Sequence, residues 1–167
     1  MSFYLEGYNK KILFDTGQSG HFIENAKVLG IDISEVDALV ISHGHYDHTG
    51  GLEAFLKLNA KASIFMKPAA LDAKYHGEKR FIGTSLDSHL LNNRIHLVEE
   101  ILEIDKGVFV MPDSPLVHAL DSSFCGFKIK KGDQFEEDTF IDELFLTIVR
   151  SGKMSIISSC SHRGISN

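Results

Sequence analysis

The chain is poor in cysteine, in positive charge and in long apolar runs, and each shortage argues against a class of protein. Only Cys125 and Cys160 occur among 167 residues, too few for the disulfide framework of a small secreted domain. Acidic residues outnumber basic ones by 23 to 17, and the formal charge of −6 argues against general binding to nucleic acid or membrane surfaces. No apolar run reaches the roughly 20 residues of a transmembrane helix, and the first residues do not resemble a signal peptide. We therefore expect a soluble, cytoplasmic protein with no nucleic-acid or membrane partner.

The length and the apolar content of 43% predict a single domain that spans residues 1–167. Strand-like segments recur at residues 2–6, 11–14, 38–42, 62–66, 94–98, 108–111, 124–130, 143–150 and 154–158. The first two are expected to pair as an antiparallel hairpin. Helical patterns occur at residues 19–29, 49–59 and 68–75. Because strands outnumber helices, the sequence predicts a mixed α/β fold, with two sheets and helices outside them.

The most informative segment follows the strand predicted at residues 38–42. Residues 42–51 read Ser-His-Gly-His-Tyr-Asp-His-Thr-Gly-Gly, so three histidines and one aspartate fall within six positions. Imidazole and carboxylate are the donors that zinc and neighbouring transition metals prefer. His43 and His45 fall on the same side of an extended segment, whereas Asp47 and His48 lie past a bend and can face a second ion about 3.5–4 Å from the first. The loop therefore predicts one or two divalent ions, with zinc as the default and iron, manganese or nickel as alternatives.

Two further strand ends carry similar residues. Residues 12–17 read Ile-Leu-Phe-Asp-Thr-Gly, and residues 158–165 read Ser-Ser-Cys-Ser-His-Arg-Gly-Ile. Together with the histidine loop and the Asp-Glu-Leu run at residues 142–144, they resemble the metallo-β-lactamase fold superfamily. The segments look most like its branch named for dihydropterin-ribofuranosylaminobenzene-phosphate synthase. The resemblance is strong over residues 11–59 and 154–167 and weak between residues 85 and 135.

The resemblance implies an αββα sandwich with a one- or two-metal site at the edge where the two sheets meet. It implies that His43 and His45 hold the first metal and that Asp47 and His48 hold the second. His162 corresponds to a later histidine ligand of the family. Asp47 is also the candidate catalytic residue, because a carboxylate at this position can orient or deprotonate the attacking water.

Three other residues are expected to support the ligands without binding the metal. Asp15 matches an acidic position of the family and is expected to hold the histidine loop in place. Asp142 opens a strand, where it either supports the site or is merely solvated. Cys160 is interpreted as a small packed side chain next to the site, because free cysteine is often buried.

A basic cluster stands out in the otherwise acidic chain. It contains Lys74, His76, Lys79 and Arg80, and a solvated surface is its default interpretation. In this branch the region flanks the site, so Lys79 and Arg80 are candidates for binding a phosphate or carboxylate group of the substrate.

Members of the family usually begin with another strand before the segment matching Ser2. They also continue past the segment matching Asn167 to a strand end that bears one more histidine ligand. The sandwich is therefore expected to be incomplete on its C-terminal side, and the uncovered sheet edge favours a homodimer.

The leading hypothesis is a metal-dependent hydrolase, in which the ion lowers the pKa of bound water to about 7 and polarises an ester or phosphoester bond. Its partner would be a small, anionic substrate. One alternative is a pterin-linked transferase of the kind that gives the branch its name. The other is an incomplete metal-binding domain without catalytic activity.

Overall fold

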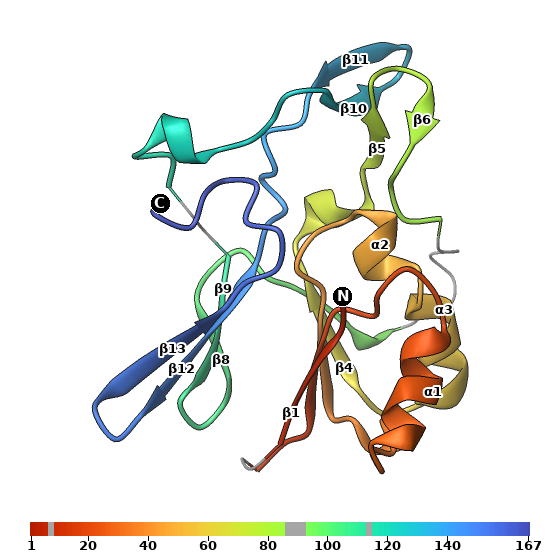
Figure 1. Ribbon diagram of the computed structural model, residues 1–167, viewed down its shortest axis with the longest axis vertical. Coiled ribbons are helices and arrows are strands. Elements are labelled where there is room, and N and C mark those ends of the chain that lie inside the picture. Colours follow the sequence, from red (N-terminus) through yellow and green to blue (C-terminus); the bar gives the residue numbers. More distant parts are fainter. Residues whose placement is uncertain (7–8, 86–92, 113–114) are drawn as a thin grey trace.

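The computed structural model describes residues 1–6, 9–85, 93–112 and 115–167, and it shows two facing sheets with a third sheet beyond one end (Figure 1). The first sheet has the order β1-β2-β3-β4-β7. Its strands are β1 (Phe3–Leu5), β2 (Ile12–Phe14), β3 (Ala38–Val40), β4 (Ser63–Met66) and β7 (Ile95–Leu97). β1 and β2 form the predicted antiparallel hairpin, and the remaining neighbours are parallel. The parallel pairing brings the carboxyl ends of β2 and β3 to one edge of the sheet.

Helices cover the outer face of this first sheet (Figure 1). The helices are α1 (His21–Val28), α2 (Tyr46–Thr49) and α3 (Leu52–Leu58). The described residues also form 3₁₀ turns at Ile33–Glu35, Pro68–Leu71 and Ala119–Asp121, the last of them near the C-terminus and away from this sheet (Figure 1). Leu52 and Phe55 of α3 are buried in one core cluster with Leu39 and Ile64 of the sheet, because they recur on a single face of the helix. The helices predicted at residues 19–29 and 49–59 are thus confirmed as α1 and α3, whereas the short helix α2 was expected to be part of the histidine loop.

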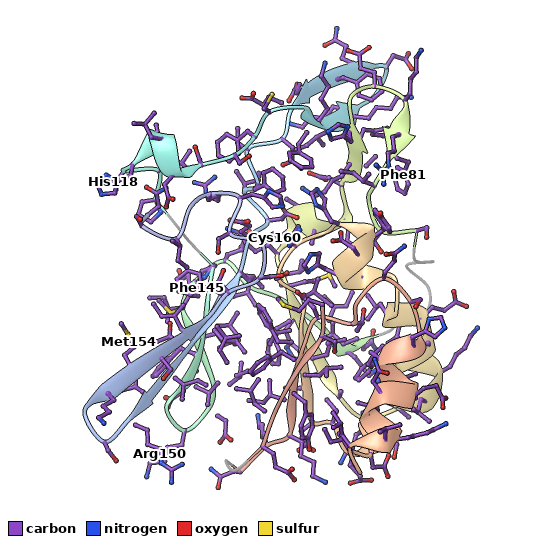
Figure 2. All side chains as sticks on the ribbon, in the orientation of Figure 1. Phe81, His118, Phe145, Arg150, Met154 and Cys160 are labelled. Atoms are coloured by element: carbon purple, nitrogen blue, oxygen red, sulfur yellow. The ribbon has the colours of Figure 1, made fainter. Side chains whose placement is uncertain are left out.

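The second sheet packs against the inner face of the first. Its order is β13-β12-β9-β8, all antiparallel, with strands β8 (Leu102–Asp105), β9 (Val108–Met111), β12 (Phe145–Arg150) and β13 (Lys153–Ile157). Its apolar side chains join those of the first sheet in a second core cluster, which includes Phe14, Val40, Val110 and Leu146. No helix of the described residues covers its opposite face, where Met154 on the β12–β13 hairpin is 65% exposed (Figure 2). The described chain therefore provides three of the four layers of an αββα sandwich.

The third sheet lies beyond the strand ends that carry the histidine loop (Figure 1). It has the order β11-β10-β5-β6, with strands β5 (Ala73–His76), β6 (Arg80–Phe81), β10 (Phe127–Lys131) and β11 (Gln134–Glu137). The helix predicted at residues 68–75 is wrong after its first turn, because residues 73–76 pair with β10 instead. None of the described helices is both long and apolar enough to cross a membrane.

Candidate metal centre

The candidate site starts at the carboxyl ends of β2 and β3. These strands pair in parallel, with Phe14 opposite Val40. The two segments stay side by side just past the strands, since the backbone N–H of Asp15 donates to the Val40 carbonyl at 2.9 Å. The carboxylate of Asp15 is therefore placed under the loop that follows β3.

Asp15 is fully buried and links three segments of the site. Its backbone φ of 61° is a left-handed conformation, which aspartate adopts more readily than most residues. Its carboxylate accepts hydrogen bonds from the Ser42 backbone N–H at 2.7 Å and from the Ser42 hydroxyl at 2.8 Å. Oδ2 also lies 2.8 Å from His48 Nδ1 and 3.1 Å from the Ser159 hydroxyl. Asp15 thus fixes the ring of His48 and ties the histidine loop to the segment that follows β13.

Three imidazoles converge next to this network. The Nε2 atoms of His43, His45 and His162 are buried, and none has a hydrogen-bond partner among the described residues. The ligand atoms of the three side chains lie within 4.8 Å of one another. His43 Nδ1 is 2.9 Å from the Ser42 hydroxyl, so its Nε2 is the nitrogen left for another partner. Since an unsatisfied buried polar atom is costly, three of them facing one point fit a metal ion.

The histidines of the 43–48 loop differ in charge state: His43 and His45 are neutral, whereas His48 is protonated. Burial, followed by the neighbouring His48 and His45, lowers the pKa of His43 well below its usual value. Burial also lowers the pKa of His45 to about 4, so both rings are neutral at pH 7, the form that binds metals. At His48 burial acts in the same direction, but hydrogen bonds to Asp15 and Asp47 outweigh it and raise the pKa to about 11. In the metal-free chain His48 is thus protonated, and its hydrogen bond holds the pKa of Asp47 at about 2.

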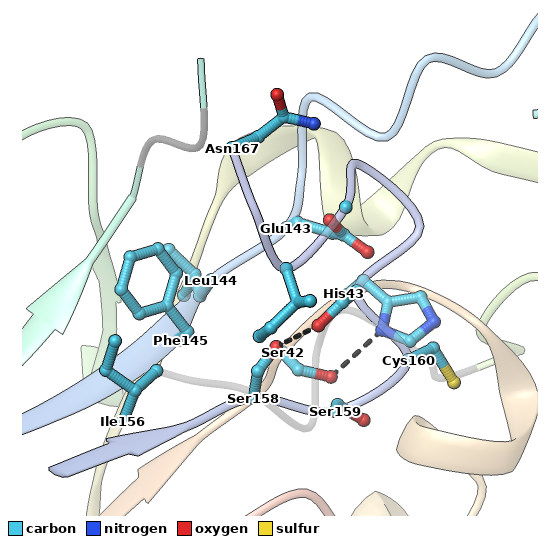
Figure 3. Close-up of a pocket in the computed structure, with 13 residues that line it drawn as sticks. Ser42, His43, Glu143, Leu144, Phe145, Ile156, Ser158, Ser159, Cys160 and Asn167 are labelled. Carbon is cyan, nitrogen blue, oxygen red and sulfur yellow. Dashed lines mark hydrogen bonds between the residues drawn. The ribbon is translucent and has the colours of Figure 1, made fainter. Parts of the chain in front are cut away.

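Two side chains lie close to Nε2 of His48, the ring nitrogen that does not contact Asp15. Asp47 Oδ2 lies 3.3 Å from His48 Nε2, and Cys160 Sγ lies 3.2 Å from it. Cys160 was expected to be a packed neighbour of the site, yet it is exposed and lies beside the ring of His43 (Figure 3). Hydrogen bonds with His162 and then His48 lower the pKa of its thiol to about 6.

A segment that the sequence analysis largely missed, residues 138–143, holds both ligand loops. Asp142 is buried, and its Oδ2 accepts a hydrogen bond from the Gly44 backbone N–H at 2.8 Å, between His43 and His45. The carboxylate of Glu143 accepts hydrogen bonds from the backbone N–H groups of residues 162 and 163. Asp142 is therefore a supporting residue of the histidine loop rather than a solvated one.

Lys74, interpreted above as part of a basic surface, is fully buried instead. Its Nζ lies 2.6 Å from Asp138 Oδ2 and 2.9 Å from Asp142 Oδ1. Burial lowers the pKa of Lys74, but Asp142 and Asp138 outweigh burial and raise it. Asp138 also accepts a hydrogen bond from the Phe140 backbone N–H at 2.9 Å, and the Phe140 ring stacks on His162 with centroids 3.9 Å apart. The ion pairs of Lys74 with Asp138 and Asp142 therefore anchor residues 138–142, against which His162 packs.

The other basic residues lie outside this buried network. Arg80 is exposed on β6, and its Nη2 donates to the Tyr46 hydroxyl at 3.2 Å. Tyr46 directly precedes Asp47 and is tied to the same region by its backbone N–H, which donates to the Ile82 carbonyl at 2.8 Å. Lys79 is exposed in the turn before β6. The structure thus brings Arg80 to the rim of the histidine loop, with Lys79 next to it in the chain.

Comparisons with known proteins agree with this geometry. Residues 1–130 match the family model of the metallo-beta-lactamase superfamily. The chain belongs to that superfamily. It is 31% identical over 182 residues to 7,8-dihydropterin-6-methyl-4-(beta-D-ribofuranosyl)-aminobenzene-5'-phosphate synthase of Methanocaldococcus jannaschii, covering 99% of this chain and 62% of that protein. It is 33% identical over 87 residues to a UPF0173 metal-dependent hydrolase of Staphylococcus aureus, covering 50% of this chain and 35% of the relative.

Among solved structures, the chain is similar to Tm1679, described as a metal-dependent hydrolase of the beta-lactamase superfamily. The two share 36% identity and a TM-score of 0.77, over 92% of this chain and 57% of the other. The predicted superfamily, branch resemblance and fold class are therefore confirmed. The chain spans about three fifths of the length of the M. jannaschii synthase and of Tm1679, 62% of the first and 57% of the second.

Proposed function

We propose that this metallo-β-lactamase domain acts as a metal-dependent hydrolase on an ester or phosphoester, with the metal held by His43, His45 and His162. The observation that carries the proposal is the set of three buried Nε2 atoms without partners. A bound divalent ion would supply hydroxide from water near neutral pH and would polarise the bond to be broken. The nitrogen donors favour zinc.

The remaining residues of the loop orient the reactants. The Asp47 side chain is 47% exposed and is anchored through His48, so its carboxylate can accept a hydrogen bond from the attacking water. His48 is held by Asp15 and presents Nε2 to a second ion. Asp142 keeps the loop backbone in place through Gly44, which keeps His43 and His45 at a fixed separation.

The substrate we propose is small and anionic. Arg80 is exposed at the rim of the histidine loop, where its guanidinium can pair with a phosphate or carboxylate. Lys79 adds a second cation beside it. Neutralising these residues, as Arg80→Gln or Lys79→Gln, is expected to raise KM for anionic esters and leave KM for neutral esters unchanged. Equal effects on both kinds of ester would exclude the two cations from substrate binding.

The central experiment combines metal analysis with turnover of model esters. The chain is loaded with zinc, its metal content is measured, and p-nitrophenyl acetate, p-nitrophenyl phosphate and bis(p-nitrophenyl) phosphate are supplied. We expect His43→Ala and His45→Ala to lose both zinc and turnover, whereas His118→Ala, an exposed histidine, keeps both. Asp47→Ala should lose more turnover than zinc. A zinc-loaded chain that cleaves none of the esters would contradict the proposal.

A second candidate is the synthase activity in the name of the M. jannaschii relative. The 31% identity over 99% of this chain favours it. Incubation with the precursors of the named aminobenzene phosphate product, followed by mass spectrometry, separates the two candidates. Formation of that product without ester hydrolysis would replace the hydrolase proposal.

A further inference from the structure

Ser42, the residue before the first histidine of the loop, lies between two polar side chains. Its hydroxyl oxygen is 2.8 Å from Asp15 Oδ2 and 2.9 Å from His43 Nδ1. All three residues are at most 1% exposed. The backbone of Ser42 is held on both sides, because its N–H donates to Asp15 Oδ1 at 2.7 Å and its carbonyl accepts from the Leu144 N–H at 2.7 Å. The hydroxyl oxygen therefore has a fixed place between a carboxylate and an imidazole.

The single proton of this hydroxyl can point to only one of the two neighbours. Asp15 is surrounded by hydrogen-bond donors. Besides the N–H and O–H of Ser42, His48 Nδ1 lies 2.8 Å and the Ser159 hydroxyl 3.1 Å from Oδ2 of this carboxylate. Such surroundings stabilise an ionised carboxylate, which only accepts hydrogen bonds. The Ser42 proton therefore points to Asp15, and the hydroxyl oxygen is left to accept a hydrogen bond from His43 Nδ1.

This hydrogen bond decides which nitrogen of His43 can bind a metal. Burial, followed by the neighbouring His48, lowers the pKa of His43, so its ring is neutral and carries a single N–H. With the proton held on Nδ1, the ring keeps the lone pair of Nε2, the buried atom that has no partner among the described residues. The opposite tautomer would place an N–H there and could not bind an ion.

We propose that Ser42 is a positioning residue of the metal centre: its hydroxyl donates to Asp15, accepts from His43 Nδ1, and so fixes the tautomer whose Nε2 can bind the ion. Figure 3 shows the hydrogen bond between the Ser42 hydroxyl and the His43 ring. Asp15 thus acts on two rings, on His48 by direct contact and on His43 through this hydroxyl. The inference rests on the metal centre of the proposed function, but it does not require that the chain hydrolyse esters.

Three variants separate this hydrogen-bond chain from a purely structural role of the same residues. Ser42→Ala removes the acceptor of the His43 proton. Ser42→Thr keeps a hydroxyl, and its extra methyl group has room because Ser42 lines a cavity of about 70 Å³. Asp15→Asn keeps the side-chain size but reverses the chain. Its amide oxygen must stay opposite the Ser42 N–H, so its NH₂ group replaces Oδ2 and donates to the Ser42 oxygen, whose own proton then turns to His43 Nδ1.

Proton–nitrogen NMR correlation spectra of the metal-free full chain at neutral pH show which ring nitrogen of His43 is protonated. We expect the proton on Nδ1 in wild type and Ser42→Thr, on both nitrogens as a mixture of tautomers in Ser42→Ala, and on Nε2 in Asp15→Asn. The matched control is Ser158→Ala, which removes a nearby hydroxyl that lies 2.6 Å from that of Ser161 and should keep the wild-type spectrum. A proton on Nε2 in wild type, or on Nδ1 in both Ser42→Ala and Asp15→Asn, would overturn the proposal. The wild-type spectrum alone can do so even where a variant fails to fold.

Zinc affinity gives a second readout. Chelator competition should show a loss of about 10–100-fold in Ser42→Ala and in Asp15→Asn, and wild-type affinity in Ser42→Thr and Ser158→Ala. Unchanged affinity in both Ser42→Ala and Asp15→Asn would also overturn the proposal. Ester hydrolysis is scored separately. The expected tautomers without turnover remove the hydrolase and leave the role of Ser42, whereas turnover by a wild type whose His43 is protonated on Nε2 does the reverse.

Discussion

Removing the buried cation of Lys74 is expected to have the largest effect on stability of the changes considered. Lys74→Met keeps most of the side-chain volume but deletes the charge that lies 2.6 Å from Asp138 and 2.9 Å from Asp142. All three side chains are at most 1% exposed, so water cannot replace the lost ammonium group. The variant should therefore lose about 3–5 kcal/mol of unfolding free energy, the usual cost of leaving a buried charge unpaired.

Urea and thermal unfolding of the metal-free chain, followed by circular dichroism, measure this loss. In a domain of this size it corresponds to a fall in Tm of about 6–20 °C. The matched control is Lys131→Met, because the Lys131–Glu136 ion pair is 62% and 54% exposed and should contribute no more than about 1 kcal/mol. Combining Lys74→Met with Asp138→Asn and Asp142→Asn should restore stability, since amides keep the backbone hydrogen bonds without leaving unpaired charges.

The deficit of Lys74→Met should also depend on pH. Burial already raises the pKa of Asp142 above 3.8, and loss of the neighbouring cation raises it further. A carboxyl group with a raised folded-state pKa binds more protons when folded, so stability falls as pH increases through that range. The deficit is therefore smallest near about pH 4 and largest at neutral pH. A variant as stable as Lys131→Met at neutral pH, or a deficit that grows toward acid pH, would refute the reasoning.

Three further predictions concern the metal centre. Asp15→Ala should weaken zinc affinity about 10–100-fold in a chelator competition, because it releases the ring of His48, and unchanged affinity would remove Asp15 from the network. Gly44→Ala should lower both Tm and zinc content, since a Cβ there would lie 2.1 Å from the Ala70 carbonyl oxygen; wild-type values would show that the loop can shift. In the metal-free chain burial lowers the pKa of His45 to about 4, so the unfolded state binds the extra proton and stability should fall between pH 6.5 and 4, by at most about 1.4 kcal/mol per pH unit. His45→Gln should make that slope shallower in urea titrations at several pH values, and an unchanged slope would contradict this assignment.

Local sequence patterns predicted most of the sandwich. The strand expected at residues 108–111 is β9 without change, and the predicted parallel-sheet strands are found within two residues of their bounds, because buried apolar runs mark them. Strands with few apolar residues were missed. β11 contains Gln134–Glu137 and is mostly exposed, so it has no apolar run and its pairing with β10 cannot be recognised from its own residues.

In the candidate site, too, residues marked by a local sequence pattern could be predicted, whereas residues brought together by packing could not. The candidate ligands between His43 and His48 could be recognised because they are close in sequence, and Asp15 could be recognised because it directly follows a strand. The partners of Lys74 are 64 and 68 residues away, and no local pattern distinguishes a lysine buried between two aspartates from one in a solvated basic cluster. The position of Cys160 beside His48 likewise depends on how the end of β13 packs against the histidine loop.

The separation of the ligands along the chain also determines when the metal centre can form during folding. The histidine loop and the loop that carries His162 follow strands of different sheets, and the contact between His48 and Cys160 that joins these loops spans 112 residues of the sequence. Bringing them together closes a long loop, whose entropy cost must be met by docking the two sheets before any ion can gain ligands from both. Metal binding should therefore come late in folding, and it should change the rate of unfolding rather than the rate of folding. An ion that joins both loops must lose ligands before the sheets can separate, so the loaded chain is expected to unfold more slowly while refolding at the rate of the metal-free chain.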